Sequence, residues 1–208
     1  MTSISLVISD VDGTLVTHDK RLTDAAIKAV RHLTEKKIAF TVTSSRPSFG
    51  MRMLVQPLGL KLPLGAFNGS LIVDPAFNVL QKSVIPAATA RMVIDMLGAR
   101  GVDIWLFTAD RWLITRNDGH YVPHERNTIL TDPIAVSGFD SAIDDACKIV
   151  GVSADPEKLV HCESEMQAAL GGRALAARSQ SYYLDITPAG RDKGTFVEAM
   201  AARLGISQ

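Results

Sequence analysis

The sequence predicts an α/β fold in which a parallel-sheet core is interrupted by an inserted α+β module. Three short apolar runs, separated by helical patterns, predict parallel strands joined by right-handed crossovers. From about residue 82 the pattern changes to one typical of antiparallel strands, and the α/β pattern returns only near the end. We therefore expect a core domain of residues 1–82 and 184–208 and an inserted domain of residues 83–183.

Strands and helices alternate along the first part of the chain. Thr23 is placed to cap an amphipathic helix, and Lys36 and Lys37 lie where the negative end of that helix would be. A loop-rich helical stretch precedes the third apolar run. The predicted core strands cover residues 4–9, 38–43 and 62–67, and a helix over residues 195–204 completes the core.

A polar residue follows each predicted core strand. Asp10, Ser44 and Asn68 stand at these three positions. Ligands of open parallel sheets bind beyond the carboxyl ends of the strands, where such residues gather. The order of the elements therefore predicts one pocket that collects all three side chains.

The sequence of the inserted module predicts two helices and several strands. Asp118, Gly119 and Pro123 predict a loop around His120 and His124, which argues against a helical metal site at that pair. The pattern predicts helices over residues 87–100 and 156–170, and strands over residues 102–108, 112–116, 146–153, 173–178 and 182–186.

The composition excludes several classes of protein. The 208 residues contain 22 Lys and Arg and 22 Asp and Glu, so no global positive field would draw the chain to nucleic acid or to an anionic membrane. No apolar run approaches the ~18 residues needed to span a bilayer. Two cysteines, Cys147 and Cys162, are too few for a disulfide framework, so we expect a cytoplasmic protein.

Two aspartates close to the first strand are the strongest chemical signal. Asp10 and Asp12 would point to opposite faces of an extended strand, but Gly13 lets the chain turn so that both carboxylates converge. Such a pair suits either a hard cation or a nucleophile with an acid/base partner. A calcium-binding EF-hand loop is excluded, because Leu15 and Arg21 stand where that loop needs Gly and Glu.

Four segments together resemble the haloacid dehalogenase superfamily, and more narrowly its Cof-like phosphatases. Residues 10–15 (Asp-Val-Asp-Gly-Thr-Leu) are similar to the first motif, and residues 43–47 (Thr-Ser-Ser-Arg-Pro) to the second, with Ser45 replacing a glycine. Asn68-Gly69 matches the pair that closes the third strand, and residues 192–194 (Asp-Lys-Gly) match the lysine motif. The resemblance spans essentially the whole chain. It implies a Rossmann-like core with the α+β cap inserted between the second and third motifs.

The resemblance implies an Mg²⁺-dependent phosphatase that hydrolyses small phosphorylated metabolites, sugar phosphates foremost, through an aspartyl-phosphate. Asp10 would be the nucleophile and Asp12 the acid/base, and both would contribute to the metal site. Ser44 would hold the phosphoryl oxygens, and Lys193 would supply a cation that offsets their charge.

The same resemblance places further residues on the substrate side of the site: Gly13, Ser45, Arg46, Asn68 and Gly69. Two roles are considered for Arg46: it positions the substrate, or it pairs with an acidic side chain.

The family's fourth motif, Gly-Asp followed by Asn-Asp, completes the metal site in relatives and is absent from the 208 residues. We therefore expect weak Mg²⁺ binding, low activity and a chain that is part of a longer enzyme. The core would be incomplete at its C-terminal end, and the first strand would keep an open edge that tends to pair with another chain, a homodimer being one such assembly. The alternative function is an inactive relative that binds phosphorylated ligands without turnover.

Overall fold

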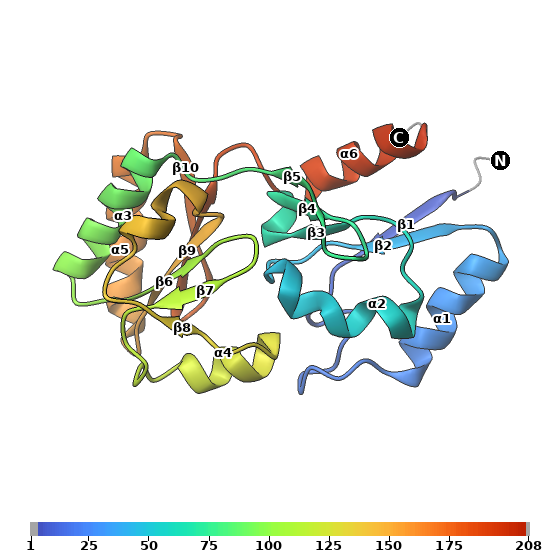
Figure 1. Cartoon of the computed structure of the whole chain (residues 1–208), viewed down its shortest axis with the longest axis horizontal. Helices are drawn as coiled ribbons and strands as arrows, with labels where there is room; N and C mark the ends of the chain where they lie inside the picture. The colour runs from blue at the N-terminus through green and yellow to red at the C-terminus, as the bar shows by residue number, and fades with distance from the viewer. Residues whose placement is uncertain (1–3, 207–208) are drawn as a thin grey trace. The chain divides into compact units, whose positions relative to one another are not determined.

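The computed structural model describes residues 4–206 and divides into two compact units (Figure 1). The first unit lies within Met1–Lys82 and Arg191–Gln208, and the second is Ser83–Gly190. The expected return to the core at residue 184 falls inside a strand, Tyr183–Pro188, that is hydrogen-bonded within the sheet of the second unit. The chain therefore leaves the second unit some residues later than the sequence predicts.

The first unit begins with a parallel β-α-β element. Strand β1 (Leu6–Ser9) pairs in parallel with β2 (Ala39–Val42), and helix α1 (Asp24–Glu35) connects them. The Thr23 hydroxyl accepts the Ala26 N–H, so it caps α1 as the sequence predicts. After β2 come a short 3-10 turn (Ser48–Met51) and helix α2 (Arg52–Leu58).

The third core strand belongs to a different sheet from the one expected. A single parallel bridge, Thr43 to Gly65, joins the end of β2 to β3 (Leu64–Ala66). Beyond it, β3 pairs antiparallel with β4 (Leu71–Val73), which pairs antiparallel with β5 (Val79–Lys82). The sequence analysis did not predict β4 and β5.

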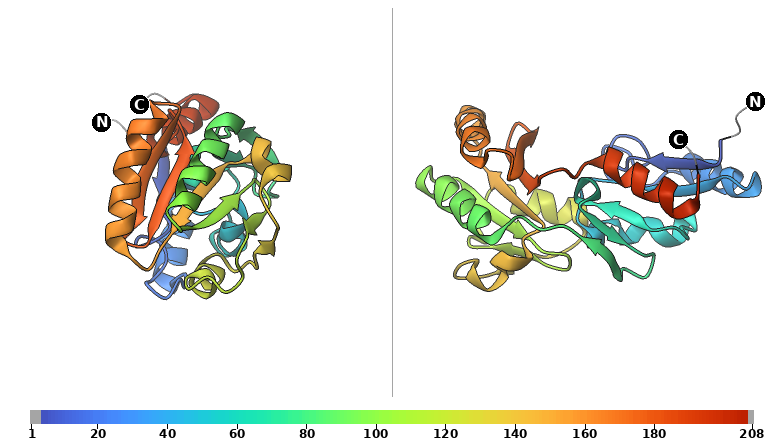
Figure 2. Two further views of the ribbon diagram at one scale, coloured as in Figure 1. Left: turned by 90° about the vertical axis from the view of Figure 1, so that its left-hand side faces the viewer. Right: turned by 90° about the horizontal axis from the view of Figure 1, so that it is seen from above.

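Helix α6 (Lys193–Leu204) completes the first unit. It lies on the side of the core strands opposite α1 and α2 (Figures 1 and 2). Phe196 and Met200 from α6 are buried against Ile72 of β4. This apolar contact fixes the start of α6, where Lys193 lies, against the strands.

The second unit is a six-stranded sheet with helices packed on one face. The strand order is β10-β11-β9-β6-β7-β8, and β6 (Asp103–Phe107) and β7 (Trp112–Ile114) form the predicted antiparallel pair. Helices α3 (Ala87–Ala99) and α5 (Pro156–Leu170) pack on each other, on β6, and on β10 and β11. The remaining strands are β8 (Ile134–Ala135), β9 (Lys148–Val152), β10 (Ala174–Gln180) and β11 (Tyr183–Pro188).

One segment of the second unit is helical where a loop was predicted. Helix α4 (Val122–Ile129) contains Pro123 and His124. The prediction of a loop there is wrong because Pro123 occupies the first turn, where a missing N–H breaks no helical hydrogen bond. A 3-10 turn (Asp140–Asp145) follows later. None of the helices within residues 4–206 is both long and apolar enough to cross a bilayer.

Candidate active site

Asp10 directly follows β1, and both of its carboxylate oxygens are engaged. Oδ1 accepts the Val11 N–H at 2.7 Å, and Oδ2 lies 2.8 Å from the Lys193 ammonium. The Asp10 and Lys193 side chains keep 38% and 41% of their surface exposed, so a ligand from solvent reaches them. A half-exposed carboxylate held in one orientation beside a cation is suited to act as a nucleophile on a negatively charged ester.

Lys193 is far from Asp10 in sequence, and a close backbone contact holds it next to Asp10. Asp192 caps α6 and forms a reciprocal capping box with Thr195. Gly69 packs against this first turn, because a Cβ at Gly69 would lie 2.7 Å from the Asp192 carbonyl oxygen. Gly69 also has a φ of 91°, a conformation that side-chain-bearing residues rarely adopt. The Asn68-Gly69 pair therefore serves to dock the lysine-bearing helix.

Asp12 faces two cations rather than one. Arg46 donates from Nε to Oδ2 and from Nη2 to Oδ1, both at 2.8 Å, and Lys20 donates from Nζ to Oδ1 at 2.7 Å. The third Arg46 nitrogen, Nη1, donates to the Gly50 carbonyl oxygen at 3.1 Å. Arg46 is 4% exposed, so its guanidinium is directed to Asp12 and to the backbone.

These cations control the charge of Asp12. Burial raises the pKa of its carboxyl, but the hydrogen bonds and charges of Arg46 and Lys20 outweigh burial and lower the pKa from 3.8 to about 2. Asp12 is therefore ionised at neutral pH when no substrate is bound.

The turn of residues 11–16, which contains Asp12, depends on Gly13. The N–H groups of Leu15 and Val16 both donate to the Val11 carbonyl oxygen, at 3.0 and 3.1 Å. Gly13, at the exposed bend, has a φ of 73°. The chain leaves the strand immediately after Asp10 for this reason, as the sequence predicts.

Residues that follow β2 form hydrogen bonds that link this site to the third core strand. The Ser44 hydroxyl accepts the Arg46 N–H at 3.2 Å, and the Ser44 carbonyl oxygen accepts the Asn68 N–H at 2.8 Å. The Ser44 side chain is fully buried and Ser45 is half-buried. The structure therefore connects the ends of β2 and β3 through Ser44 and Asn68.

Sequence reasoning missed one member of the site, Lys20. It lies ten residues after Asp10 in a loop, and no spacing rule links a loop lysine to a strand-end aspartate. Only the hydrogen-bonded turn of residues 17–21, which closes the loop through Thr17 and Arg21, brings its ammonium to Asp12.

Of the two aspartates that follow β1, Asp10 has more freedom to hold a metal. Within residues 4–206 no group of three or more His, Cys, Asp or Glu side chains is arranged to hold a metal ion. The carboxylate of Asp12 is occupied by Arg46 and Lys20, whereas Asp10 retains free lone pairs on both oxygens. Magnesium sites with one protein carboxylate are completed by water and by substrate oxygens, so Asp10 fits such a site.

Comparison with known proteins places the chain in a family. Residues 7–208 match the family described as haloacid dehalogenase-like hydrolase. An HMP-PP phosphatase from Escherichia coli O81 (strain ED1a) is 24% identical over 97% of this chain and 74% of the relative. A protein with the same name from Shigella boydii serotype 4 is 25% identical over 97% of this chain and 77% of the relative.

Solved structures show the same fold. A haloacid dehalogenase-like hydrolase from Bacteroides thetaiotaomicron superposes with a TM-score of 0.89 at 21% identity, covering 99% of this chain and 79% of that one. A haloacid dehalogenase-like hydrolase from B. subtilis superposes with a TM-score of 0.86 at 19% identity, covering 98% and 80%. The resemblance found in the motifs is confirmed, and the chain belongs to the haloacid dehalogenase-like hydrolase family.

Proposed function

We propose that the protein is a phosphatase that hydrolyses small phosphoric monoesters through an aspartyl-phosphate on Asp10. The observation that carries this proposal is the pairing of Asp10 with Lys193 at the end of β1, with a second carboxylate, Asp12, two residues further along the chain. A carboxylate attacks a phosphate ester only if cations offset the repulsion between the two anions. Lys193 provides one such cation next to the attacking oxygen.

In the first step, an oxygen of Asp10 forms a bond to phosphorus while the bond to the leaving oxygen breaks. The Val11 N–H and Lys193 keep the carboxylate in one orientation, which lowers the entropic cost of the attack. The Ser44 hydroxyl accepts the Arg46 N–H and is buried in the structure, so its proposed contact with a phosphoryl oxygen requires the end of β2 to open when the substrate binds.

Asp12 is suited to the second step in the state that the structure shows. As an ionised carboxylate it accepts a proton from the water that attacks the aspartyl-phosphate. To protonate a leaving alkoxide in the first step, Asp12 must gain a proton first. The negative charge of a bound phosphate favours that gain, because a like charge raises the pKa of a carboxyl.

We propose that Asp10 would bind Mg²⁺, with the backbone carbonyl of Asp12 as a second ligand. The ion would add positive charge at the phosphoryl oxygens when bound. We propose a sugar phosphate or another phosphorylated metabolite as substrate, which is consistent with relatives named as HMP-PP phosphatases. A reducing cytosol is the proposed location, supported by the free and buried thiols of Cys147 and Cys162.

Hydrolysis of p-nitrophenyl phosphate with Mg²⁺ tests the proposal. We expect Asp10→Asn to lower kcat by about a thousandfold or more, since it removes the nucleophile. Asp95→Asn, on the exposed face of α3, is the matched control and should keep full activity. Borohydride reduction of the working enzyme should convert Asp10 to homoserine, detectable by mass spectrometry. Full activity of Asp10→Asn would refute the proposal.

A second candidate is binding of phosphorylated ligands without turnover. It is favoured by the engagement of both carboxylates with cations in the structure. The two candidates separate in one experiment, because calorimetric binding of a sugar phosphate with no release of phosphate supports the second alone.

A further inference from the structure

Lys20 reaches Asp12 from a tight turn in the loop that follows β1. The Thr17 N–H donates to the Arg21 carbonyl oxygen and the Lys20 N–H donates to the Thr17 carbonyl oxygen, both at 2.9 Å. Val16 is bridged to Leu22 on the return path of the chain. This hydrogen-bonded turn holds the stem of Lys20 over the site and places its ammonium 2.7 Å from Asp12.

The backbone of Lys20 is in an unfavourable conformation for a lysine. Its φ is 62°, in the left-handed region where glycine is preferred and where other residues lose about 1 kcal/mol or more. Glycine would fit this turn without strain, but it would supply no charge to the site. The position thus combines a local cost with a side chain that contacts the candidate active site.

At Asp12 two cationic side chains face one carboxylate, so this side of the site has an excess of positive charge. Asp10 has one cationic partner, Lys193. Asp12 has two, and Arg46 by itself already donates to both carboxylate oxygens. Lys20 is therefore not needed to balance the charge of Asp12 or to supply a donor to either of its carboxylate oxygens.

Lys20 is also the cation at Asp12 that a ligand reaches. Its side chain is 32% exposed, whereas that of Arg46 is 3% exposed. An ammonium group carries three N–H donors, and one of them is directed to Asp12. The other two can bind an anion without breaking the contact with Asp12.

We propose that Lys20 is a specificity-determining residue that binds an anionic group, a carboxylate or a second phosphate, on the leaving group of the substrate. The proposal rests on the proposed function, in which Asp10 attacks phosphorus and Asp12 faces the leaving oxygen. Because Lys20 contacts Asp12 and Lys193 contacts Asp10, the extra charge is offered on the leaving-group side. Substrates with a charged leaving group should thus be preferred over neutral polyol phosphates.

Two phosphate esters that differ mainly in one charge test this role. 3-Phosphoglycerate releases an alcohol that carries a carboxylate, and glycerol 3-phosphate releases a neutral alcohol. With Mg²⁺ held constant, we expect the wild type to prefer 3-phosphoglycerate in kcat/KM. Lys20→Met keeps the stem but removes the charge. It should lower the preference, which is the ratio of kcat/KM for 3-phosphoglycerate to kcat/KM for glycerol 3-phosphate, about five- to tenfold, mainly through KM for 3-phosphoglycerate. An effect exerted through Asp12 would act on both substrates alike and cancel in this ratio.

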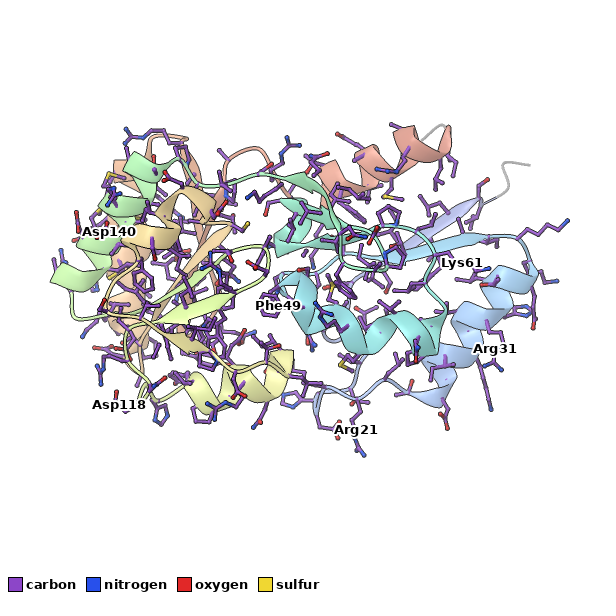
Figure 3. All side chains as sticks on the ribbon, viewed as in Figure 1. Arg21, Arg31, Phe49, Lys61, Asp118 and Asp140 are labelled. Atoms are coloured by element: carbon purple, nitrogen blue, oxygen red, sulfur yellow. The ribbon has the colours of Figure 1, made fainter. Side chains whose placement is uncertain are left out.

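Three further variants separate binding from folding. Lys20→Arg should keep the preference, because it keeps the charge. Lys20→Gly should lose the preference as Lys20→Met does, with an unfolding midpoint no lower than that of the wild type, because glycine relieves the backbone strain. Arg21→Met changes the neighbouring residue, whose side chain is 81% exposed and points outward from the loop (Figure 3), and should change neither substrate.

Equal losses on both substrates in Lys20→Met would overturn the proposal, since Lys20 would then serve the phosphoryl group or the placement of Asp12. No change on either substrate would overturn it as well. If the wild type hydrolyses neither ester, calorimetric binding of the same two compounds judges Lys20 instead; the proposed function fails only if p-nitrophenyl phosphate is not hydrolysed either. A wild-type binding preference for 3-phosphoglycerate that Lys20→Met loses supports the role of Lys20, and the absence of a wild-type preference refutes it.

Discussion

Arg46 holds Asp12 through two parallel hydrogen bonds, a geometry that the planar guanidinium allows and a lysine ammonium does not. The pair is also asymmetric in exposure, because Arg46 is buried and Asp12 keeps 30% of its side-chain surface in solvent. Losing the arginine therefore leaves a partly buried carboxylate with Lys20 as its remaining cation.

Arg46→Lys should destabilise the protein by about 1–2 kcal/mol, and Arg46→Ala by roughly 2–3 kcal/mol. The physical reason is the loss of paired hydrogen bonds, followed in the alanine variant by an emptied cavity. Urea unfolding followed by circular dichroism measures both values. Equal stability of Arg46→Ala and the wild type would show that the ion pair contributes nothing to folding.

Asp12 should make the stability of the protein depend on pH in acid. Its pKa is about 2 in the folded protein and 3.8 in the unfolded chain, so the folded state is favoured while the carboxylate is ionised. This contribution, roughly 1–2 kcal/mol after allowance for exposure, is complete above pH 3.8 and is lost as pH falls through about 2. Urea unfolding of Asp12→Asn between pH 5 and 2 should show a shallower dependence on pH than the wild type.

The control for this measurement is Asp95→Asn, which removes one exposed carboxylate from α3. Its pH dependence should follow that of the wild type. Parallel curves for Asp12→Asn and the wild type would contradict the link between Asp12 and acid stability.

At the residue level, the position after a strand predicted where the Asp10 side chain leaves the sheet, and the family resemblance predicted Lys193 near it; the structure pairs these two side chains. The two uses considered for Arg46 could not be separated from sequence, since the choice depends on whether its guanidinium is buried. Lys20 could not be found at all. Its contact with Asp12 comes from the fold of a loop, and loop conformation follows from hydrogen bonds that no periodicity records.

At the level of elements, the position of α6 depends on its contact with Gly69. The first turn of the helix and the Asn68-Gly69 turn touch so closely that a methyl group would meet the Asp192 carbonyl oxygen. Any shift of this turn moves Lys193, the first residue of the helix.

Gly69→Ala should destabilise the protein by about 2–4 kcal/mol and lower phosphatase activity, because the new Cβ requires both a strained φ and a displaced helix. Thermal unfolding and the assay with p-nitrophenyl phosphate measure the two effects. Gly98→Ala is the matched control, since Gly98 lies in α3 with nothing within 4 Å of the added methyl. It should stabilise the protein by about 0.5–1 kcal/mol without a change in activity. An unshifted melting temperature in Gly69→Ala would contradict the close packing.

Helices with a clear cap at each end were easier to predict than very short strands. The range predicted for α5 agrees with the structure at both ends, because Asp155 caps its start and Gly171 ends it in a left-handed conformation. Strands β4 and β5 are only three and four residues long, and such short runs show little alternation. Their register depends instead on Asp74, whose carboxylate accepts the N–H groups of Ala76 and Asn78 across the turn.

At the level of the whole molecule, the two units differ in how the chain builds them. The second unit is one continuous segment with its own apolar core of residues from α3, α5 and the sheet. The first unit is made from both ends of the chain. The sequence placed a strand over residues 182–186 in the inserted module, but the predicted boundary at residue 184 cut through it; the pairing of β11 with β9 and β10 keeps the whole strand in the second unit.

Residues 83–190 should fold when expressed alone, because they retain every strand of the six-stranded sheet and both packing helices. Both tryptophans of the chain, Trp105 and Trp112, are buried in this unit. Tryptophan fluorescence should therefore show one cooperative urea transition in the isolated segment. A gradual, non-cooperative change would contradict an independent core.

The same tryptophans should separate the two units in the full chain. Gly69→Ala, which acts in the first unit, should shift the far-UV circular dichroism transition more than the fluorescence transition. Identical shifts by both probes would show that the units unfold as one.

The ion pair between Asp10 and Lys193 joins residues that a ribosome makes at very different times. Asp10 is synthesised before the second unit, and the whole of the second unit must be made before its lysine partner. A nascent chain therefore carries Asp10 without its lysine partner while the second unit is being made, and it gains the charge balance proposed for catalysis only when α6 docks. Synthesis order alone would keep incomplete chains from hydrolysing metabolites.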